Sequence, residues 1–173
     1  MPRAFIVWPP AFLIDSRPCF IPVSSVAKNQ PMYRKILVAL ENSRADESLI
    51  PHIIRLAQLH RSALLLVHVA DGWVARNFNQ LKLAESEEMK ADQTYLDATA
   101  AQMRAAGLEV ETHLALGDPP TEILKTADRE QCDLIAMTTH GHRLLGDLIY
   151  GSTIEEVRHR AMIPVLLVRA MAQ

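Results

Sequence analysis

Two glycines and two hydroxyl side chains near the C-terminus have types and a spacing that could hold a phosphate. Gly141 and Gly151 are separated by nine residues, and Ser152 and Thr153 directly follow the second glycine. A bare backbone lets a phosphate oxygen approach closely. A helix that starts there directs unpaired N–H groups and the positive end of its dipole toward the anion. The stretch therefore predicts an anion site at a helix start.

The same stretch has a second interpretation that needs no ligand. Ser152 and Glu155 form a Ser-x-x-Glu capping box, in which both side chains satisfy backbone N–H groups at a helix start. His142 and Arg143 lie between the two glycines and would supply positive charge to an anion. The pattern alone leaves both interpretations open.

Apolar residues alternate between two periods from residue 33 onward. Short continuous apolar runs predict buried strands, and apolar residues three to four positions apart predict helices. The predicted strands cover residues 36–40, 63–69, 109–116, 133–137 and 164–169. Of these, residues 109–116 alternate between apolar and polar and are predicted to form an outer strand with one wetter face. The predicted helices cover residues 48–60, 80–106, 119–130 and 152–160. Strands that alternate with helices predict an α/β fold, a parallel sheet with helices on both faces. Ligands bind such sheets beyond the carboxyl ends of the strands, where the glycine loop begins.

Local signals set three of the helix ends. Pro51 fits best in a first turn, which predicts a helix start near Ser48. Gly107 is a natural C-terminal cap, and Asp118 followed by proline predicts the next N-cap.

The composition excludes several classes of protein. With 173 residues the chain is long enough for one domain, and its net charge of −2 gives no reason to expect nucleic acid or an anionic membrane as a partner. No apolar run approaches the length of a membrane-spanning helix. Cys19 and Cys132 are too far apart in sequence to suggest a disulfide framework or a metal site. We expect reduced thiols in a cytoplasmic protein.

The first 31 residues lie outside the periodic pattern. Their apolar stretch is interrupted by two prolines and by Asp15, which argues against a signal peptide. Our hypothesis is that Met32 is the natural start and that residues 1–31 come from an upstream start. The alternative is a disordered or partner-binding arm. Residues 32–173 are the predicted domain.

Residues 33–169 resemble the universal stress protein family. The stretches that carry the resemblance are ILVALENS, LLLVHV, DLIAMTTHG, GST and the closing IPVLLVR. The ATP-binding branch of this family carries Gly-x2-Gly-x9-Gly-(Ser/Thr). Here the second motif glycine is Gly141, and the third is Gly151 with Ser152 after it.

The resemblance implies a five-stranded sheet of order 3-2-1-4-5 with an adenine nucleotide at the switch point between the first and fourth strands. It implies ATP, ADP or AMP as ligand, with Mg²⁺ or Mn²⁺ bridging the phosphates. It also implies a homodimer paired through the last strand, residues 163–169, which would otherwise be an unprotected apolar edge.

Carried over position by position, the resemblance assigns residues to each part of the nucleotide. Ala39, Leu40 and Val69 would lie against adenine and ribose. Met137 and Thr138 would flank the nucleotide. The two glycines, Ser152 and Thr153 would hold the phosphates. The predicted nucleotide-binding residues are Ala39, Leu40, Val69, Glu41, Met137, Thr138, Gly141, His142, Arg143, Gly151, Ser152 and Thr153.

Two of these positions depart from the family pattern. Glu41 stands where the family usually has aspartate, so its carboxylate must fold back or shift. Thr138 stands at the first motif glycine. Its methyl group would narrow the pocket, whereas its hydroxyl would donate to a ribose or phosphate.

The sequence thus predicts a cytoplasmic stress-response protein that binds an adenine nucleotide and acts as a nucleotide-dependent dimeric regulator. Any ATP hydrolysis would be slow, because no general base or arginine finger is recognisable. The alternative is a dimeric interaction module of the same fold that docks on another protein without nucleotide. An adenylyl-transferring ligase is disfavoured because Glu41-Asn42-Ser43-Arg44 replaces the Ser-Gly-Gly-x-Asp-Ser loop that such enzymes carry.

His68 lies within the second predicted strand, and Trp73 follows that strand. His68 lacks partners at a spacing suited to zinc and is predicted to be a buried, hydrogen-bonded core residue. Trp73 is interpreted as a packing residue.

Overall fold

The computed structural model describes residues 31–70, 87–139 and 148–170, all within one compact unit, Pro31–Gln173. The expectations for residues 1–30, for Cys19 and for Trp73 lie outside the described residues.

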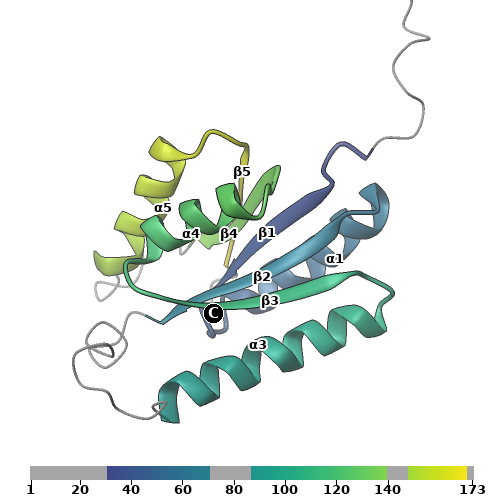
Figure 1. Cartoon of the computed structure of the whole chain (residues 1–173), viewed down its shortest axis with the longest axis horizontal. Coiled ribbons are helices and arrows are strands. Elements are labelled where there is room, and N and C mark those ends of the chain that lie inside the picture. Colours follow the sequence, from purple (N-terminus) through teal and green to yellow (C-terminus); the bar gives the residue numbers. More distant parts are fainter. Residues whose placement is uncertain (1–30, 71–86, 140–147, 171–173) are drawn as a thin grey trace, which may run out of the picture. The chain divides into compact units, whose positions relative to one another are not determined.

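Five strands form one parallel sheet of order β3-β2-β1-β4-β5, as predicted (Figure 1). The strands are β1 (Lys35–Leu40), β2 (Ala63–Ala70), β3 (Val110–Leu116), β4 (Leu134–Thr139) and β5 (Val165–Arg169). The winding direction reverses between β1 and β4, so this is the switch point at which ligands bind in open α/β sheets.

Helices cover both faces of the sheet. They are α1 (Asp46–His60), α3 (Glu87–Ala105), α4 (Pro119–Arg129) and α5 (Leu148–Arg160). α1 and α3 lie on one face, and α4 and α5 lie on the other (Figure 1). Successive residues of β1 point to opposite faces, so Ile36 and Val38 pack under α1 and α3, whereas Leu37 and Ala39 pack under α4 and α5.

The predicted start of the first helix is wrong by two residues. α1 begins at Asp46 rather than near Ser48, and Pro51 is its sixth residue. The missing proline N–H leaves only the carbonyl of Glu47 without its usual partner. Glu47 is exposed, so water can satisfy that carbonyl.

The predicted start of the last helix is also wrong. α5 begins at Leu148, so Gly151 and Ser152 are its fourth and fifth residues and Ser152 is not its N-cap. A glycine costs only about 1 kcal/mol inside a helix, and the residues before it continue the helix toward the N-terminus. The capping-box interpretation of Ser152 and Glu155 is therefore wrong, and the anion-site interpretation loses the helix start that it placed at the same residues.

Two other local signals are confirmed. Gly107, just after α3, has φ of +85°, a conformation that suits glycine. Asp118 caps α4, and its carboxylate accepts a hydrogen bond of 3.2 Å from the Thr121 N–H. The beginning of the predicted helix 80–106 lies outside the described residues, and its described part is α3.

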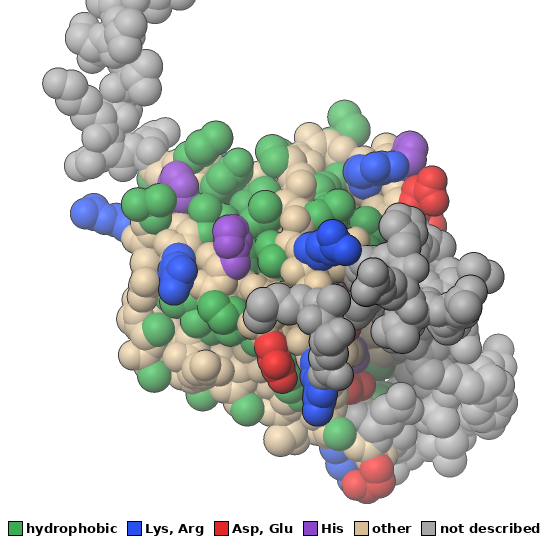
Figure 2. Space-filling view, turned by 180° about the vertical axis from the view of Figure 1, so that it is seen from behind, with side chains coloured by type: hydrophobic (Ala, Val, Ile, Leu, Met, Phe, Trp, Pro, Cys, Tyr) green, Lys and Arg blue, Asp and Glu red, His purple; other side chains and the backbone are tan. Residues whose placement is uncertain are grey.

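The edge of the sheet formed by β5 is apolar except for Arg169. Every residue of β5 is half-buried or exposed, and Leu167 is 36% exposed to solvent. On the side of the molecule seen from behind, hydrophobic side chains gather with single basic and histidine side chains among them (Figure 2).

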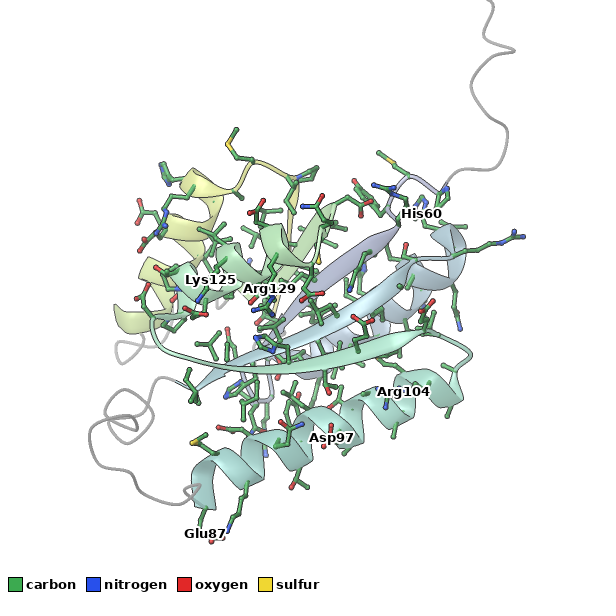
Figure 3. All side chains as sticks on the ribbon, viewed as in Figure 1. His60, Glu87, Asp97, Arg104, Lys125 and Arg129 are labelled. Carbon is green, nitrogen blue, oxygen red and sulfur yellow. The ribbon has the colours of Figure 1, made fainter. Side chains whose placement is uncertain are left out.

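Arg104 ties the end of α3 to the start of β3. Its guanidinium donates to the Val110 carbonyl oxygen at 2.6 and 3.1 Å, and Figure 3 shows this side chain near the end of the helix. These two bonds close the turn between α3 and β3.

The described residues bear on two predictions from composition, one about membrane-spanning helices and one about cysteines. No described helix has the length and apolar character needed to cross a membrane. Cys132 is a free, buried thiol, and burial raises its pKa to about 11. At neutral pH it is therefore a packing group rather than a nucleophile.

Replacing the cap of α4 tests how its start is fixed. We expect Asp118→Ala to lower the free energy of unfolding by about 1 kcal/mol, because the Thr121 N–H loses its acceptor. Urea denaturation measures the change. Asp128→Ala removes an exposed carboxylate from the last turn of the same helix, where the dipole disfavours it, and should cost nothing. Equal losses in both variants would show that the cap does not hold this helix.

Candidate ligand-binding site at the switch point

A cavity of about 370 Å³ lies at the carboxyl ends of β1 and β2, beside the switch point. Its volume falls within the range of roughly 300–1,000 Å³ that small-molecule sites occupy. The lining residues come from both sides of the sheet ends and from three helices. They are Ala39, Leu40, Glu41, Asn42, Val67, His68, Val69, Ala70, Ala91, Asp92, Pro119, Ile123, Met137 and Thr153.

The structure brings half of the predicted site residues together around this cavity. The six that line it are Ala39, Leu40, Glu41, Val69, Met137 and Thr153. Gly151 and Ser152 lie in the early part of α5, two residues or fewer from Thr153. Gly141, His142 and Arg143 lie outside the described residues, so the predicted phosphate loop stays a prediction.

Thr138 is buried and is not among the residues that line the cavity. Its hydroxyl donates to Oε1 of Glu41 at 3.2 Å. The predicted narrowing of the pocket by its methyl group stays a prediction, because the loop that follows Thr139 lies outside the described residues. The two positions that depart from the family pattern contact each other.

A buried carboxylate, Asp46, holds the turn between β1 and α1. Its oxygens accept from the N–H groups of Glu41 (3.2 Å) and Ser43 (3.3 Å) and from the Tyr95 hydroxyl of α3 (2.8 Å). Burial raises the pKa of Asp46 above its ordinary value, and these hydrogen bonds oppose that rise. Asp46 thus holds the backbone of Glu41, a cavity-lining residue and the first residue of the turn.

Tyr95 remains a hydrogen-bond donor throughout the physiological range. Burial raises the pKa of its phenol, and the neighbouring Asp46 carboxylate raises it further. A phenol that keeps its proton can always donate to Asp46, so α3 is bound to the β1–α1 turn.

A second polar cluster on the cavity wall joins β1, β2 and α3. Asp92 accepts from the side-chain amide of Asn42 at 2.9 Å, and its other oxygen lies 3.3 Å from Nε2 of His68. Nδ1 of His68 lies 2.9 Å from the Leu40 carbonyl oxygen. Because a carbonyl oxygen only accepts, Nδ1 carries a hydrogen. Asn42 adopts φ of +55°, which asparagine tolerates better than most residues.

These contacts place two carboxylates, Glu41 and Asp92, on one wall of the cavity. Carboxylates accept hydrogen bonds and repel anions, so this wall suits the hydroxyl or amino groups of a ligand. The opposite lining, which includes Ile123 and Met137, is apolar and suits a flat ring. The cavity can therefore bind a molecule with an apolar ring and neutral donors.

Sequence patterns missed Asn42, His68 and Asp92 as site residues. His68 is hydrogen-bonded, as predicted, but it also lines the cavity. Asp92 lies on the predicted long helix, and no pattern along that helix distinguishes it from solvent-exposed acids. Of the three, only Asn42 has a residue type that hints at its role, because asparagine adopts positive φ more readily than most residues. Among the described residues, no group of three or more His, Cys, Asp or Glu side chains could hold a metal ion.

The parallel sheet defines a protein of the doubly wound α/β class, and its cavity lies at the reversal of strand order, where such folds bind ligands. The family model described as "Universal stress protein family" matches residues 32–169, and the chain belongs to this family. The match spans the strands and helices that build the cavity.

Relatives in other organisms match most of their own length. A universal stress protein of Methanocaldococcus jannaschii is 28% identical over 158 residues, which cover 80% of this chain and 96% of that one. A universal stress protein of Thermus aquaticus is 32% identical over 142 residues, which cover 80% of this chain and all of that one. The solved structure of the Methanocaldococcus protein superimposes with a TM-score of 0.68 at 27% identity and covers 82% of this chain and 99% of that one.

Removing the Tyr95 hydroxyl tests the buried turn. Burial raises the folded-state pKa of Asp46 above its unfolded value, so the contribution of Asp46 to stability is greatest at low pH and is lost as pH rises through the folded pKa. Tyr95→Phe removes a donor that lowers the pKa of Asp46. The variant therefore loses more stability than the original protein as pH rises. We expect a cost of about 1.5–3 kcal/mol at pH 7 and about 0.5–1.5 kcal/mol at a pH below the ordinary carboxyl range.

Urea denaturation at both pH values measures this cost. The matched control is Tyr33→Phe, because the Tyr33 ring packs against His60 and the same change removes no hydrogen bond to a carboxylate. A Tyr95→Phe penalty that is equal at the two pH values would contradict the role of the ionised Asp46.

Proposed function

We propose that this chain binds an adenine nucleotide in the switch-point cavity and acts in the cytoplasm as a nucleotide-dependent, dimeric stress-response regulator. The observation that supports this most directly is the cavity of about 370 Å³ where β1 and β4 diverge, with an apolar side and a wall of hydrogen-bond acceptors. A purine ring fits the apolar side, and ribose hydroxyls fit the acceptors.

The charge of the cavity orients the proposed ligand. Phosphates carry negative charge and are repelled by Glu41 and Asp92, so the phosphate chain points toward α5, from which Thr153 lines the cavity. Gly141, Gly151 and Ser152 remain the predicted phosphate contacts. A Mg²⁺ or Mn²⁺ ion would bind between the phosphates of a triphosphate.

Solved structures of this fold include nucleotide complexes. A universal stress protein of Archaeoglobus fulgidus was solved with dAMP (22% identity, TM-score 0.60), and another universal stress protein was solved with cAMP (18% identity, TM-score 0.62). At these identities the likeness shows the fold alone. The ligands belong to those proteins, and they make adenine nucleotides the first probes to use here.

Nucleotide binding is tested by thermal unfolding with ATP plus Mg²⁺, ADP and AMP. A ligand at about one hundred times its Kd stabilises the native state by about 2.7 kcal/mol, which corresponds to a Tm rise of about 8 °C. Val69→Trp places a large ring in the cavity and should abolish the rise. Leu59→Trp, at a position 78% exposed on α1, should preserve it.

A Tm that none of the nucleotides moves at millimolar concentration would overturn nucleotide binding. It would favour the alternative, an interaction module of the same fold.

The proposed dimer uses β5, the outermost strand beside β4. β5 pairs with β4 on one side only, and Leu166 and Val168 are only partly covered. An apolar edge strand with unpaired backbone groups is a template for pairing with a second chain.

A charge on β5 tests this interface. We expect Leu167→Asp to convert the dimer to a monomer in sedimentation velocity experiments, because the carboxylate would be buried without a partner. Leu116→Asp is the matched control, since Leu116 lies on the opposite edge strand, β3, with the same exposed fraction of 36%. A dimer that survives the first change or dissociates with the second would place the interface elsewhere.

A further inference from the structure

The Glu41 side chain is held from two directions at the cavity wall. Oε1 accepts from the Thr138 hydroxyl at 3.2 Å, and Oε2 accepts from the Ser43 hydroxyl at 3.4 Å. The backbone N–H of Glu41 donates to Asp46. Both the main chain and the carboxylate of this cavity residue are therefore fixed before any ligand arrives.

Of the two hydroxyls, that of Thr138 is the firmer anchor. Thr138 is 1% exposed and lies in β4 opposite Val168 of β5, inside the sheet, whereas Ser43 is exposed in the turn. A β-branched side chain has few accessible rotamers, so a buried threonine presents its hydroxyl in one direction. The position of the Glu41 carboxylate is thereby linked to the core of the sheet.

Holding a glutamate has an energetic consequence. Fixing its rotamers costs up to about 1.5–2 kcal/mol of conformational free energy. When folding has already met that cost, a ligand that donates to the carboxylate binds more tightly, because no side chain must be ordered on binding. A glutamate released from Thr138 would sample other rotamers, including ones that carry its negative charge toward the phosphates.

We propose that Thr138 is a positioning residue of the cavity, whose hydroxyl holds the Glu41 carboxylate at the wall and so raises affinity for a ligand that meets this wall with neutral hydroxyl or amino donors. The inference rests on the proposed function for the identity of the probe, an adenine nucleotide. The hydrogen bond between Thr138 and Glu41 exists without ligand, so the coupling between these two side chains does not depend on the proposed function.

Isothermal titration calorimetry with ADP on three variants separates positioning from packing. Thr138→Val keeps the side-chain volume but removes the hydroxyl, and we expect affinity to fall about five- to tenfold. Thr138→Ser keeps the hydroxyl but removes a buried methyl group, so affinity should stay within about twofold of the original while the Tm falls. Thr139→Val, the same change one residue along β4 and on the other face, should alter affinity by less than about twofold.

A double-mutant cycle with Glu41→Ala tests whether the effect passes through the carboxylate. Without Glu41, the hydroxyl of Thr138 has no carboxylate to hold, so Thr138→Val should change affinity by less than about twofold in that background. The same cycle measured by urea denaturation without nucleotide should also be non-additive. Both results support the proposal.

Three results would overturn it. They are an equal loss of affinity from Thr138→Val in both backgrounds, no loss in either, and a loss from Thr138→Ser as large as that from Thr138→Val. If the unchanged protein binds no adenine nucleotide, the proposed function fails instead. The denaturation cycle then decides the pairing, and additive changes in unfolding free energy would show that Thr138 does not hold Glu41.

Discussion

The carboxylate of Asp46 is the interaction on which the site depends. It is 1% exposed, and a charge buried without donors would cost several kcal/mol. Its donors are two backbone N–H groups of the β1–α1 turn and the hydroxyl of Tyr95. The need to satisfy this group fixes the turn, the first residue of α1 and the placement of α3 together. Glu41, which lines the cavity, supplies one of those N–H donors.

Continuous apolar runs made the strands predictable from the sequence, because a strand buried on both faces tolerates few polar residues. The strand order followed from the resemblance rather than from periodicity. Helix starts were harder. The signal at Gly151 and Ser152 has the composition of a cap, yet α5 begins at Leu148, since local cap signals do not report how far a helix extends before them. Asp92 and His68 meet only because α3 packs across β2, and a contact between distant elements leaves no mark on either segment.

The two departures from the family pattern illustrate the same limit. Glu41 and Thr138 are 97 residues apart in sequence, and each taken alone suggested a weakened site. In the fold they form one hydrogen bond at the end of two neighbouring strands. The longer acidic side chain reaches a hydroxyl that a glycine would not supply. A pattern that scores positions one at a time treats such a pair as two defects.

α3 is attached to the β1–α1 turn at two points one helical turn apart, since Asp92 bonds to Asn42 and Tyr95 bonds to Asp46. The turn cannot shift toward or away from a bound molecule without moving this helix or breaking those bonds. The outer surface of α3, which faces away from β2 and β3, is thus coupled through these two bonds to the turn beside the cavity. A partner that docks on that outer surface would respond to whether the cavity is occupied without contacting the bound ligand.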